Sequence, residues 1–286
     1  MFDRISNSFA LAQSSWRVLR TDKQLILFPI VSGIGCFLVL LSFALPFIAH
    51  PQWLDFLNNQ NAQGRQPPPW VYIVAFAYYF CNYFVIVFCN SALISCAIVR
   101  FNGGSPTLAD GFHVAVSRLP QILAWALVSA TVGLLLKMIE SAHERAGQLI
   151  SAILGTAWTV LTYFVVPVLV VEKTGPLDAI KRSMSILRKA WGEALVGNWG
   201  IGLFIFLLML PGILLLVLAA ALFMANPVAG AAVGLLGVLF MALVSAAGSA
   251  LHGIYLGALY QYAAFDKVPK GFKRSTMEAA FTRKSR

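Results

Sequence analysis

The stretch ALVGNWGIGLFIFLLMLPGILLLVLAAALFMA, Ala194 to Ala225, contains no charged residue, and after Asn226-Pro227 a second such stretch runs from Val228 to Leu251. An uninterrupted apolar segment of roughly 18 or more residues is typical of a membrane-spanning helix. A helix needs about 20 residues to cross a hydrocarbon core of about 30 Å. The short connection leaves room only for a tight antiparallel turn. This part of the sequence therefore predicts a transmembrane helical hairpin.

Further apolar blocks precede this hairpin. They are Leu25 to Ala49, Trp70 to Val99, Pro120 to Met138 and Leu149 to Val171. The last block continues beyond Leu251 as far as Phe265, and we expect this extension to run on as a helix into the membrane interface. Only 11% of the 286 residues are charged, whereas a soluble domain carries about 25%. The sequence therefore predicts an all-α, polytopic membrane helical bundle with six spans in three hairpins.

Basic residues are concentrated before the first span, between spans 2 and 3, between spans 4 and 5, and after span 6. Cytoplasmic segments of membrane proteins carry an excess of Lys and Arg. The distribution therefore predicts that both termini are cytoplasmic, with residues 1–265 as a single transmembrane domain and residues 266–286 as a basic cytoplasmic tail. We attribute the formal charge of +10 to this orientation signal and expect no nucleic acid as a partner. The first block begins too late and runs too long for a cleaved signal peptide, so we expect it to be retained.

Each pair of spans is preceded by a stretch with apolar residues at three- and four-residue spacing, which is typical of an amphipathic helix. The apolar positions are Ile5, Phe9, Ala12, Trp16 and Leu19; Leu108, Phe112, Ala115 and Leu119; and Ile180, Met184, Leu187 and Trp191. We expect these cytoplasmic helices to lie in the headgroup layer with the apolar face toward the membrane and the basic face toward anionic lipid. The candidate lipid-surface residues are Arg17, Arg20, Arg182, Arg188 and Lys189.

Two of these stretches share more than their spacing. Ser15-Trp16-Arg17-Val18-Leu19-Arg20 resembles Ser183-Met184-Ser185-Ile186-Leu187-Arg188. One interpretation is an ancestral repeat of an interfacial helix followed by a hairpin, used three times. The other is that every interfacial helix needs this pattern. The sequence leaves both open.

Polar residues inside the apolar blocks are few. Asn82 and Asn90 are eight residues apart in span 2, which places them about 80° apart around the helix axis. We interpret them as hydrogen-bonding partners across a helix interface. His252, near the cytoplasmic end of span 6, is either a proton relay or ligand, or an interfacial histidine bonded to water. Gly253 and Gly257, with Gly248, predict close helix packing, and so do Gly230, Gly234 and Gly237, for which a dimer face is the alternative.

Two further features fit either a functional or a structural role. Pro211-Gly212 is expected to kink span 5, because proline removes a backbone hydrogen bond. A broken helix can mark a transport site. Lys137, Glu140 and Glu144 share one helix face at the outer end of span 3, where a solvated helix end is the simpler interpretation.

No set of residues predicts catalysis. The sequence has no phosphate-binding loop, nucleophile elbow or dinucleotide fingerprint, and we expect no catalytic residues, no cofactor and no metal. The cysteines are Cys36, Cys81, Cys89 and Cys96. All four lie in apolar blocks without CxxC spacing, so a disulfide framework is not expected.

Several motifs together resemble the pattern of a family of uncharacterised bacterial six-span membrane proteins. They lie in Phe9 to Pro29, Gly175 to Ser183, Ala258 to Ala264, Val268 to Phe272, and Ala280-Phe281. More distantly, the chain is similar to the membrane domain attached to some glycerophosphodiester phosphodiesterases. The resemblance implies six spans and the bacterial inner membrane. It implies no activity, because the catalytic domain of those phosphodiesterases is absent from this sequence.

The sequence favours a non-enzymatic integral membrane protein, a scaffold or accessory subunit that organises lipid or a partner. The predicted partners are membrane lipids, with a protein partner or a second copy of the chain as a further expectation. The alternative is a transporter or channel for a small or lipid-like solute. That alternative would use span 5 and the two asparagines of span 2.

The predicted topology can be tested by cysteine labelling in a variant whose four native cysteines are replaced. A cysteine introduced between Pro51 and Pro69 should react with a membrane-impermeant maleimide applied outside intact cells, because this polar, turn-rich segment is predicted to be an external loop. The yield of labelled protein is the measurement. Labelling only after the cytoplasmic side is opened would contradict the topology.

Overall fold

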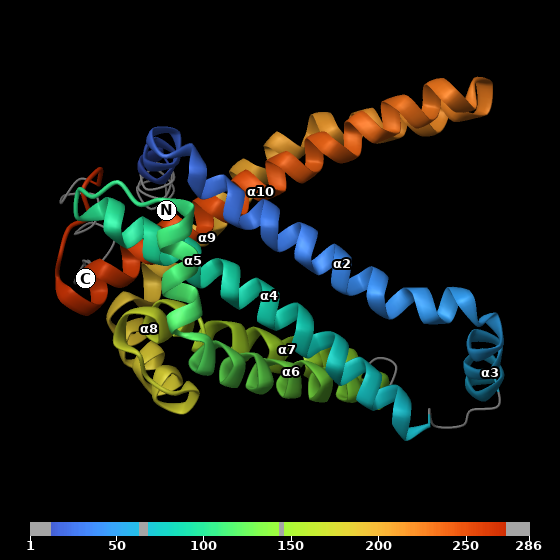
Figure 1. The fold of residues 1–286 in the computed structure, drawn as a ribbon, viewed down its shortest axis with the longest axis horizontal. Helices are drawn as coiled ribbons and strands as arrows, with labels where there is room; N and C mark the ends of the chain where they lie inside the picture. The colour runs from blue at the N-terminus through green and yellow to red at the C-terminus, as the bar shows by residue number, and fades with distance from the viewer. Residues whose placement is uncertain (1–12, 63–67, 143–145, 273–286) are drawn as a thin grey trace. The chain divides into compact units, whose positions relative to one another are not determined.

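The structure is a computed structural model that describes residues 13–62, 68–142 and 146–272; within these ranges, only the backbone is described at residues 54, 57, 58, 60–62 and 189–201. Every regular element in the described part is helical (Figure 1). Residues 13–21 form a first helix. The remaining elements are η1 (Lys23–Ile26), α2 (Leu27–Ala49), α3 (Pro51–Ala62), α4 (Pro69–Phe101), α5 (Leu108–Ser117), α6 (Leu119–Ala142), α7 (Ala146–Leu161), α8 (Val165–Glu172), α9 (Pro176–Ala225) and α10 (Pro227–Phe265).

The predicted number of spans is confirmed. Six helical segments of the described chain are long and apolar enough to cross a membrane: Lys23–Ala49, Pro69–Phe101, Leu119–Ser141, Ala146–Glu172, Gly202–Ala225 and Pro227–Phe265. The amphipathic stretch before span 3 is a separate helix, α5, whereas the stretch before span 5 is continuous with that span in the 50-residue helix α9. The protein is therefore an all-α polytopic membrane protein.

The segment after span 1 differs from the expected turn-rich loop. Residues Pro51–Ala62 form the helix α3. Pro51 occupies its first position, where a missing backbone N–H costs nothing. Trp53 and Phe56 share one face, because residues three apart on a helix are neighbours. The polar residues that follow in the same helix had suggested a loop.

Span 4 is broken, which the sequence had not indicated. Its helix stops at Leu161, and a new helix, α8, begins at Val165. Pro167 falls in the first turn of α8, where its missing N–H is tolerated. The kink expected at Pro211-Gly212 in span 5 does not interrupt α9, which is a single helix through Pro211.

The chain divides into two compact units. The first contains Met1–Ile30, Ala92–Gly111 and Ser185–Arg286; the second contains Val31–Ser91 and Phe112–Met184. The long helices α2, α4 and α9 each contribute to both units. Each unit has its own packing and is described separately.

In the first unit, α9 and α10 run side by side as the predicted hairpin (Figure 1). Asn226 caps α10, since its side-chain oxygen accepts hydrogen bonds from the backbone N–H groups of Val228 and Ala229 at 3.1 and 3.2 Å. Glycines keep the two helices close. A Cβ added at Gly230 would lie 2.5 Å from the backbone of Phe223, and one at Gly237 would lie 3.0 Å from Leu216. The prediction of small-residue packing is confirmed.

The core of the first unit lies where the C-terminal half of α10 packs on the end of α4. Gly253 faces the side chain of Leu93, and a Cβ added at Gly257 would lie 3.6 Å from Phe101. Residues 253–261 of α10 are all buried. The helix of span 6 continues to Phe265, as predicted, and its extension is packed in the core of the first unit.

The segment that follows α10 folds back onto α4. The backbone N–H of Lys270 donates to the carbonyl of Phe101 at 3.1 Å, and the rings of Phe272 and Phe101 meet edge to face at 5.8 Å. The first residues of the predicted tail are thus anchored on the protein.

In the second unit, α6 and α7 pack side by side. Trp125 and Trp158 stack between them with ring centroids 5.7 Å apart. A Cβ added at Gly133 would lie 3.3 Å from the ring of Tyr83, so α4 packs closely on α6. These contacts explain why α4 is the most enclosed span, with 56% of its most apolar window buried.

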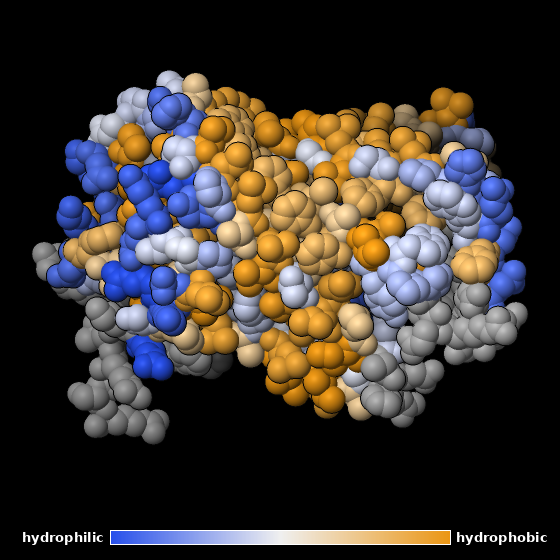
Figure 2. Space-filling model, turned by 60° about the horizontal axis from the view of Figure 1, so that its bottom comes forward, coloured by the Kyte–Doolittle hydropathy of each residue, from blue (hydrophilic) through white to orange (hydrophobic). Residues whose placement is uncertain are grey.

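The other spans leave much apolar surface exposed. Only 11% of the most apolar windows of spans 1, 5 and 6 are buried within the chain. Figure 2 shows a face on which hydrophobic residues form a broad continuous area. Exposed apolar surface of this extent suits contact with lipid tails.

The close approach of α5 to α4 can be tested at Gly111. A Cβ there would lie 2.6 Å from Phe28, 2.7 Å from the Cys96 sulfur and 3.0 Å from the Ala92 carbonyl. Gly111→Ala should therefore destabilise the protein by about 1–3 kcal/mol through overpacking. Gly33→Ala is the matched control, because no atom lies within 4 Å of its added Cβ. Thermal unfolding in detergent measures both, and equal effects would contradict the packing.

Candidate functional site

The first amphipathic helix presents a basic surface, but not with the predicted register. Ser15, Val18 and Leu19 are buried, whereas Arg17 and Arg20 are exposed. Trp16 was predicted on the apolar face beside Leu19, yet it is 43% exposed. The buried set follows the three- and four-residue spacing as well as the predicted set does. The apolar face of this first helix is buried against the protein, and its exposed face carries Arg17 and Arg20.

The start of α9 repeats this arrangement at the matching positions. Ser183, Ile186 and Leu187 are buried, as Ser15, Val18 and Leu19 are, and Arg188 is exposed, as Arg20 is. The side chain of Lys189 lies outside the described residues. The correspondence seen in the two sequences is therefore a correspondence of environment as well.

The middle helix, α5, shares the buried pattern but not the charge. Gly111 and Ala115 are buried, while His113 and Val116 are exposed. Its start is fixed by a reciprocal cap in which the Thr107 backbone N–H and hydroxyl both donate to the Asp110 carboxylate, at 2.8 and 2.7 Å.

The segments that follow spans 2, 4 and 6 also share one feature. Each span is followed by a left-handed residue, Gly103, Lys173 or Asp266, with φ of 89°, 57° and 53°. A proline follows three positions later in each case: Pro106, Pro176 and Pro269. A left-handed residue ends a helix by satisfying its last carbonyls. This threefold recurrence favours the ancestral-repeat interpretation.

Ser183 closes the break in span 4. Its hydroxyl donates to the carbonyl of Leu161 at 2.8 Å and accepts from the backbone N–H of Phe164 at 3.0 Å. These are the backbone groups left over where α7 stops. An unpaired backbone group in a buried, lipid-surrounded site is costly. Ser183 therefore acts as a seal that links the start of α9 to span 4.

Arg182 does not join the exposed basic residues. Its guanidinium pairs with the carboxylate of Glu172, with Nε 2.9 Å from Oε1 and 3.1 Å from Oε2. Nearby, Nε of Arg118 donates to the Val170 carbonyl in the last turn of α8 at 3.1 Å. A cation at this end of a helix offsets the helix dipole. Arg182 therefore forms an ion pair within the protein, with Glu172.

The asparagines of span 2 do not make the predicted contact. The Asn82 amide donates to the Tyr78 carbonyl of its own helix at 3.0 Å. Asn90 is partly buried, and its side chain makes no hydrogen bond with another described residue. The structure brings neither residue to a second helix through a hydrogen bond.

His252 lies in the packed half of α10. It is partly buried, and its neighbours Leu251, Gly253 and Ile254 are fully buried. His252 therefore lies within the core of the first unit, and its role as a proton relay or ligand, or as an interfacial histidine bonded to water, stays a prediction.

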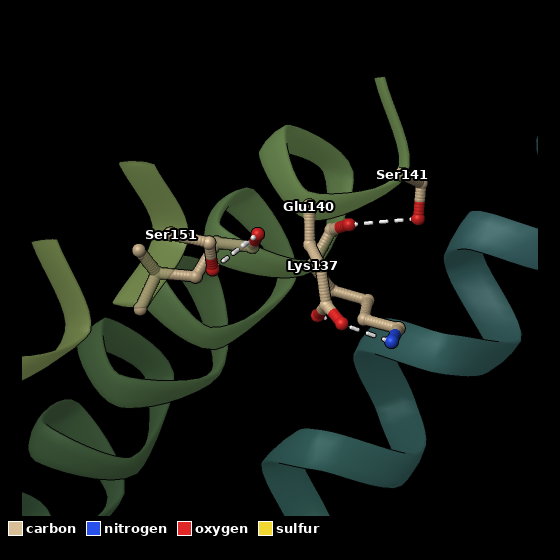
Figure 3. A network of polar contacts seen from close by, with 5 residues as sticks. Lys137, Glu140, Ser141 and Ser151 are labelled. Atoms are coloured by element: carbon tan, nitrogen blue, oxygen red, sulfur yellow. Dashed lines mark hydrogen bonds and ion pairs between the residues drawn. The ribbon is translucent and has the colours of Figure 1, made fainter. Parts of the chain in front are cut away.

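The charged residues at the C-terminal end of span 3 form a surface pair (Figure 3). Nζ of Lys137 lies 3.1 Å from a carboxylate oxygen of Glu140, and the two side chains are 56% and 41% exposed. The Ser141 hydroxyl donates to the Lys137 carbonyl, and the Ser151 hydroxyl of α7 donates to the Leu136 carbonyl. Glu144 lies outside the described residues. This arrangement is a solvated helix end that ties α7 to α6.

An aromatic pocket beside α3 was missed in the sequence. A cavity of about 350 Å³ is lined, among the described residues, by Trp53, Phe56 and Trp70. Phe47 and His50 pack behind these rings. The three-residue spacing of Trp53 and Phe56 was the available signal, but it was obscured by the polar residues around it.

The fold defines the protein as a multi-pass α-helical membrane protein with basic helical segments at the starts of its first and third hairpins. Residues 70–270 match the family of unknown function DUF6159, and the chain belongs to that family. The resemblance to a family of uncharacterised proteins is confirmed to this extent. A comparison with curated proteins gives no match, so the more distant similarity to the phosphodiesterase membrane domain has no support.

The seal at the break in span 4 can be tested by Ser183→Ala. Loss of the hydroxyl leaves the Leu161 carbonyl and the Phe164 N–H without partners, which should cost about 1–3 kcal/mol. Thermal unfolding in detergent and hydrogen exchange at residues 161–166 are the measurements.

Thr159→Ala is the control, because its hydroxyl only supplements the Gly155 carbonyl inside the continuous part of α7. Unchanged exchange at the break in Ser183→Ala would show that the hydroxyl does not seal it.

Proposed function

We propose that the protein is a non-enzymatic membrane scaffold or accessory subunit that binds anionic phospholipid through its basic helices. The observation that carries this proposal is the matched register of the first helix and the start of α9. In both, the apolar face is buried and an arginine at the same position, Arg20 or Arg188, is exposed. Arg17 adds a second exposed cation to the first helix.

Physical chemistry supports lipid phosphate as the target. Each Lys or Arg near an anionic membrane surface contributes about 1 kcal/mol of attraction. Arginine also matches the geometry of phosphate with paired N–H donors. The exposed ring of Trp16 suits the boundary between water and lipid, where tryptophan is enriched. An exposed tryptophan beside two arginines is therefore compatible with a membrane surface.

The proposal places both termini and these helices on the cytoplasmic side of a bacterial inner membrane. Support comes from the concentration of Lys and Arg on alternate segments between the spans. Anionic lipid in the cytoplasmic leaflet is the partner expected there. A protein partner or a second copy of the chain remains a prediction, for which the exposed apolar surface of spans 1, 5 and 6 leaves room.

The lipid contact can be tested with the triple variant Arg17→Gln, Arg20→Gln and Arg188→Gln. Native mass spectrometry of protein released from mixed phosphatidylglycerol and phosphatidylcholine nanodiscs should show the loss of retained phosphatidylglycerol. Three lost contacts of about 1 kcal/mol predict at least about a tenfold fall in enrichment. The wild-type enrichment should also fall with rising salt.

Lys137→Gln is the matched control, since it removes an exposed cation that is already paired with Glu140. Equal phosphatidylglycerol enrichment in the triple variant and the control would contradict the proposal. The transport alternative would replace it if proteoliposomes show a solute flux that Asn82→Ala with Asn90→Ala abolishes.

A further inference from the structure

We propose that the aromatic pocket beside α3 binds a quaternary ammonium group. The site is independent of the basic helices and of any lipid phosphate that they bind. It is formed where the end of α2, the helix α3 and the start of α4 meet, all within the second unit.

Two tryptophans form a corner at this pocket. The ring centroids of Trp53 and Trp70 are 6.4 Å apart, and their planes are inclined by 56°. Phe56 of α3 contributes the third ring, and the cavity between them measures about 350 Å³. Rings set at an angle around a cavity present their electron-rich faces to one position. This is the arrangement by which aromatic cages hold cations.

Two further rings, those of Phe47 and His50, pack against the two tryptophans. The Phe47 ring stacks on Trp70 at 6.5 Å and meets Trp53 edge to face at 6.0 Å. The His50 ring stacks on Trp53 at 5.2 Å. These contacts come from the last turn of α2 and the residue after it. A preformed cavity reduces the cost of ordering side chains on binding.

The aromatic lining, and not local charge, points to a cation. Asp55 of α3 is exposed. The described residues of α3 and of the first three turns of α4 include no Lys or Arg, and Arg65, in the segment between the two helices, lies outside the described residues. A phosphate or carboxylate would meet ring faces of Trp53, Phe56 and Trp70, which offer it no charged partner.

The apolar lining selects the kind of cation. A primary ammonium would give up hydrogen bonds to water and would find no acceptor on Trp53, Phe56 or Trp70, because indole and phenyl rings offer none. A quaternary ammonium has no N–H to desolvate and presents methyl groups that pack on the rings. The chemical class that fits is thus a trimethylammonium group, carried by a lipid headgroup or by a free solute.

The proposal is tested by binding of radiolabelled tetramethylammonium to the full chain in phosphatidylglycerol nanodiscs. We expect saturable binding that unlabelled tetramethylammonium and choline displace and that 3,3-dimethylbutanol, the neutral isostere of choline, does not. Trp53→Leu and Trp70→Leu should each raise the apparent Kd at least about fivefold, and Trp53→Phe should restore most of the affinity. Trp16→Leu is the control, because Trp16 and Trp53 are equally exposed, each at 43%.

Absence of saturable binding would overturn the proposal, and so would equal displacement by the neutral isostere. Unchanged affinity in Trp53→Leu and Trp70→Leu would also overturn it, provided that the variants elute as the wild type does in size-exclusion chromatography. Repeating the titration in phosphatidylcholine nanodiscs distinguishes the sources. Suppressed binding assigns the site to lipid headgroups, and undiminished binding assigns it to a free solute.

Discussion

Backbone N–H and C=O groups inside a membrane must find partners within the protein, because the hydrocarbon offers none. Long apolar helices meet this constraint through their own hydrogen bonds, as α4 and α10 do. Span 4 does not, because it stops and restarts around Thr162 to Phe164. The hydroxyl of Ser183 supplies the missing donor and acceptor. Because Ser183 lies in the first turns of α9, the same hydrogen bonds also attach the start of that helix to span 4.

The amphipathic helices illustrate how burial decides between two possible environments. An apolar face can be satisfied by lipid or by protein. Here Val18 and Leu19, and likewise Ile186 and Leu187, are buried. The opposite face of each helix is exposed and carries arginine: Arg17 and Arg20 in the first helix, and Arg188 in α9. The proposed binding of anionic lipid therefore rests on charge rather than on insertion of an apolar face.

The two proposed sites differ in the chemistry that they can recognise. The basic helices offer exposed guanidinium groups, which suit phosphate. The pocket beside α3 offers aromatic rings, which suit a cation that lacks N–H groups. The two sites lie in different units of the chain, apart from the first residues of α9. Each can therefore be altered by substitutions that leave the other in place.

The sequence by itself determined the number of spans and their approximate bounds, because membrane crossing depends on the length of an apolar segment, which is a local property. It also determined the hairpin at Asn226 and the glycine faces of α10. The positions of prolines alone did not predict where a span breaks. Pro46 and Pro211 lie inside continuous helices, whereas span 4 breaks just before Pro167.

Only the tertiary structure decided which face of each amphipathic helix is buried, since the sets containing Trp16 or Val18 both fit a helical period. It also decided that Arg182 pairs with Glu172 while Arg188 is left exposed. The aromatic pocket likewise required three elements to meet. Each of these outcomes depends on contacts between residues from different segments. The local sequence pattern does not predict such contacts.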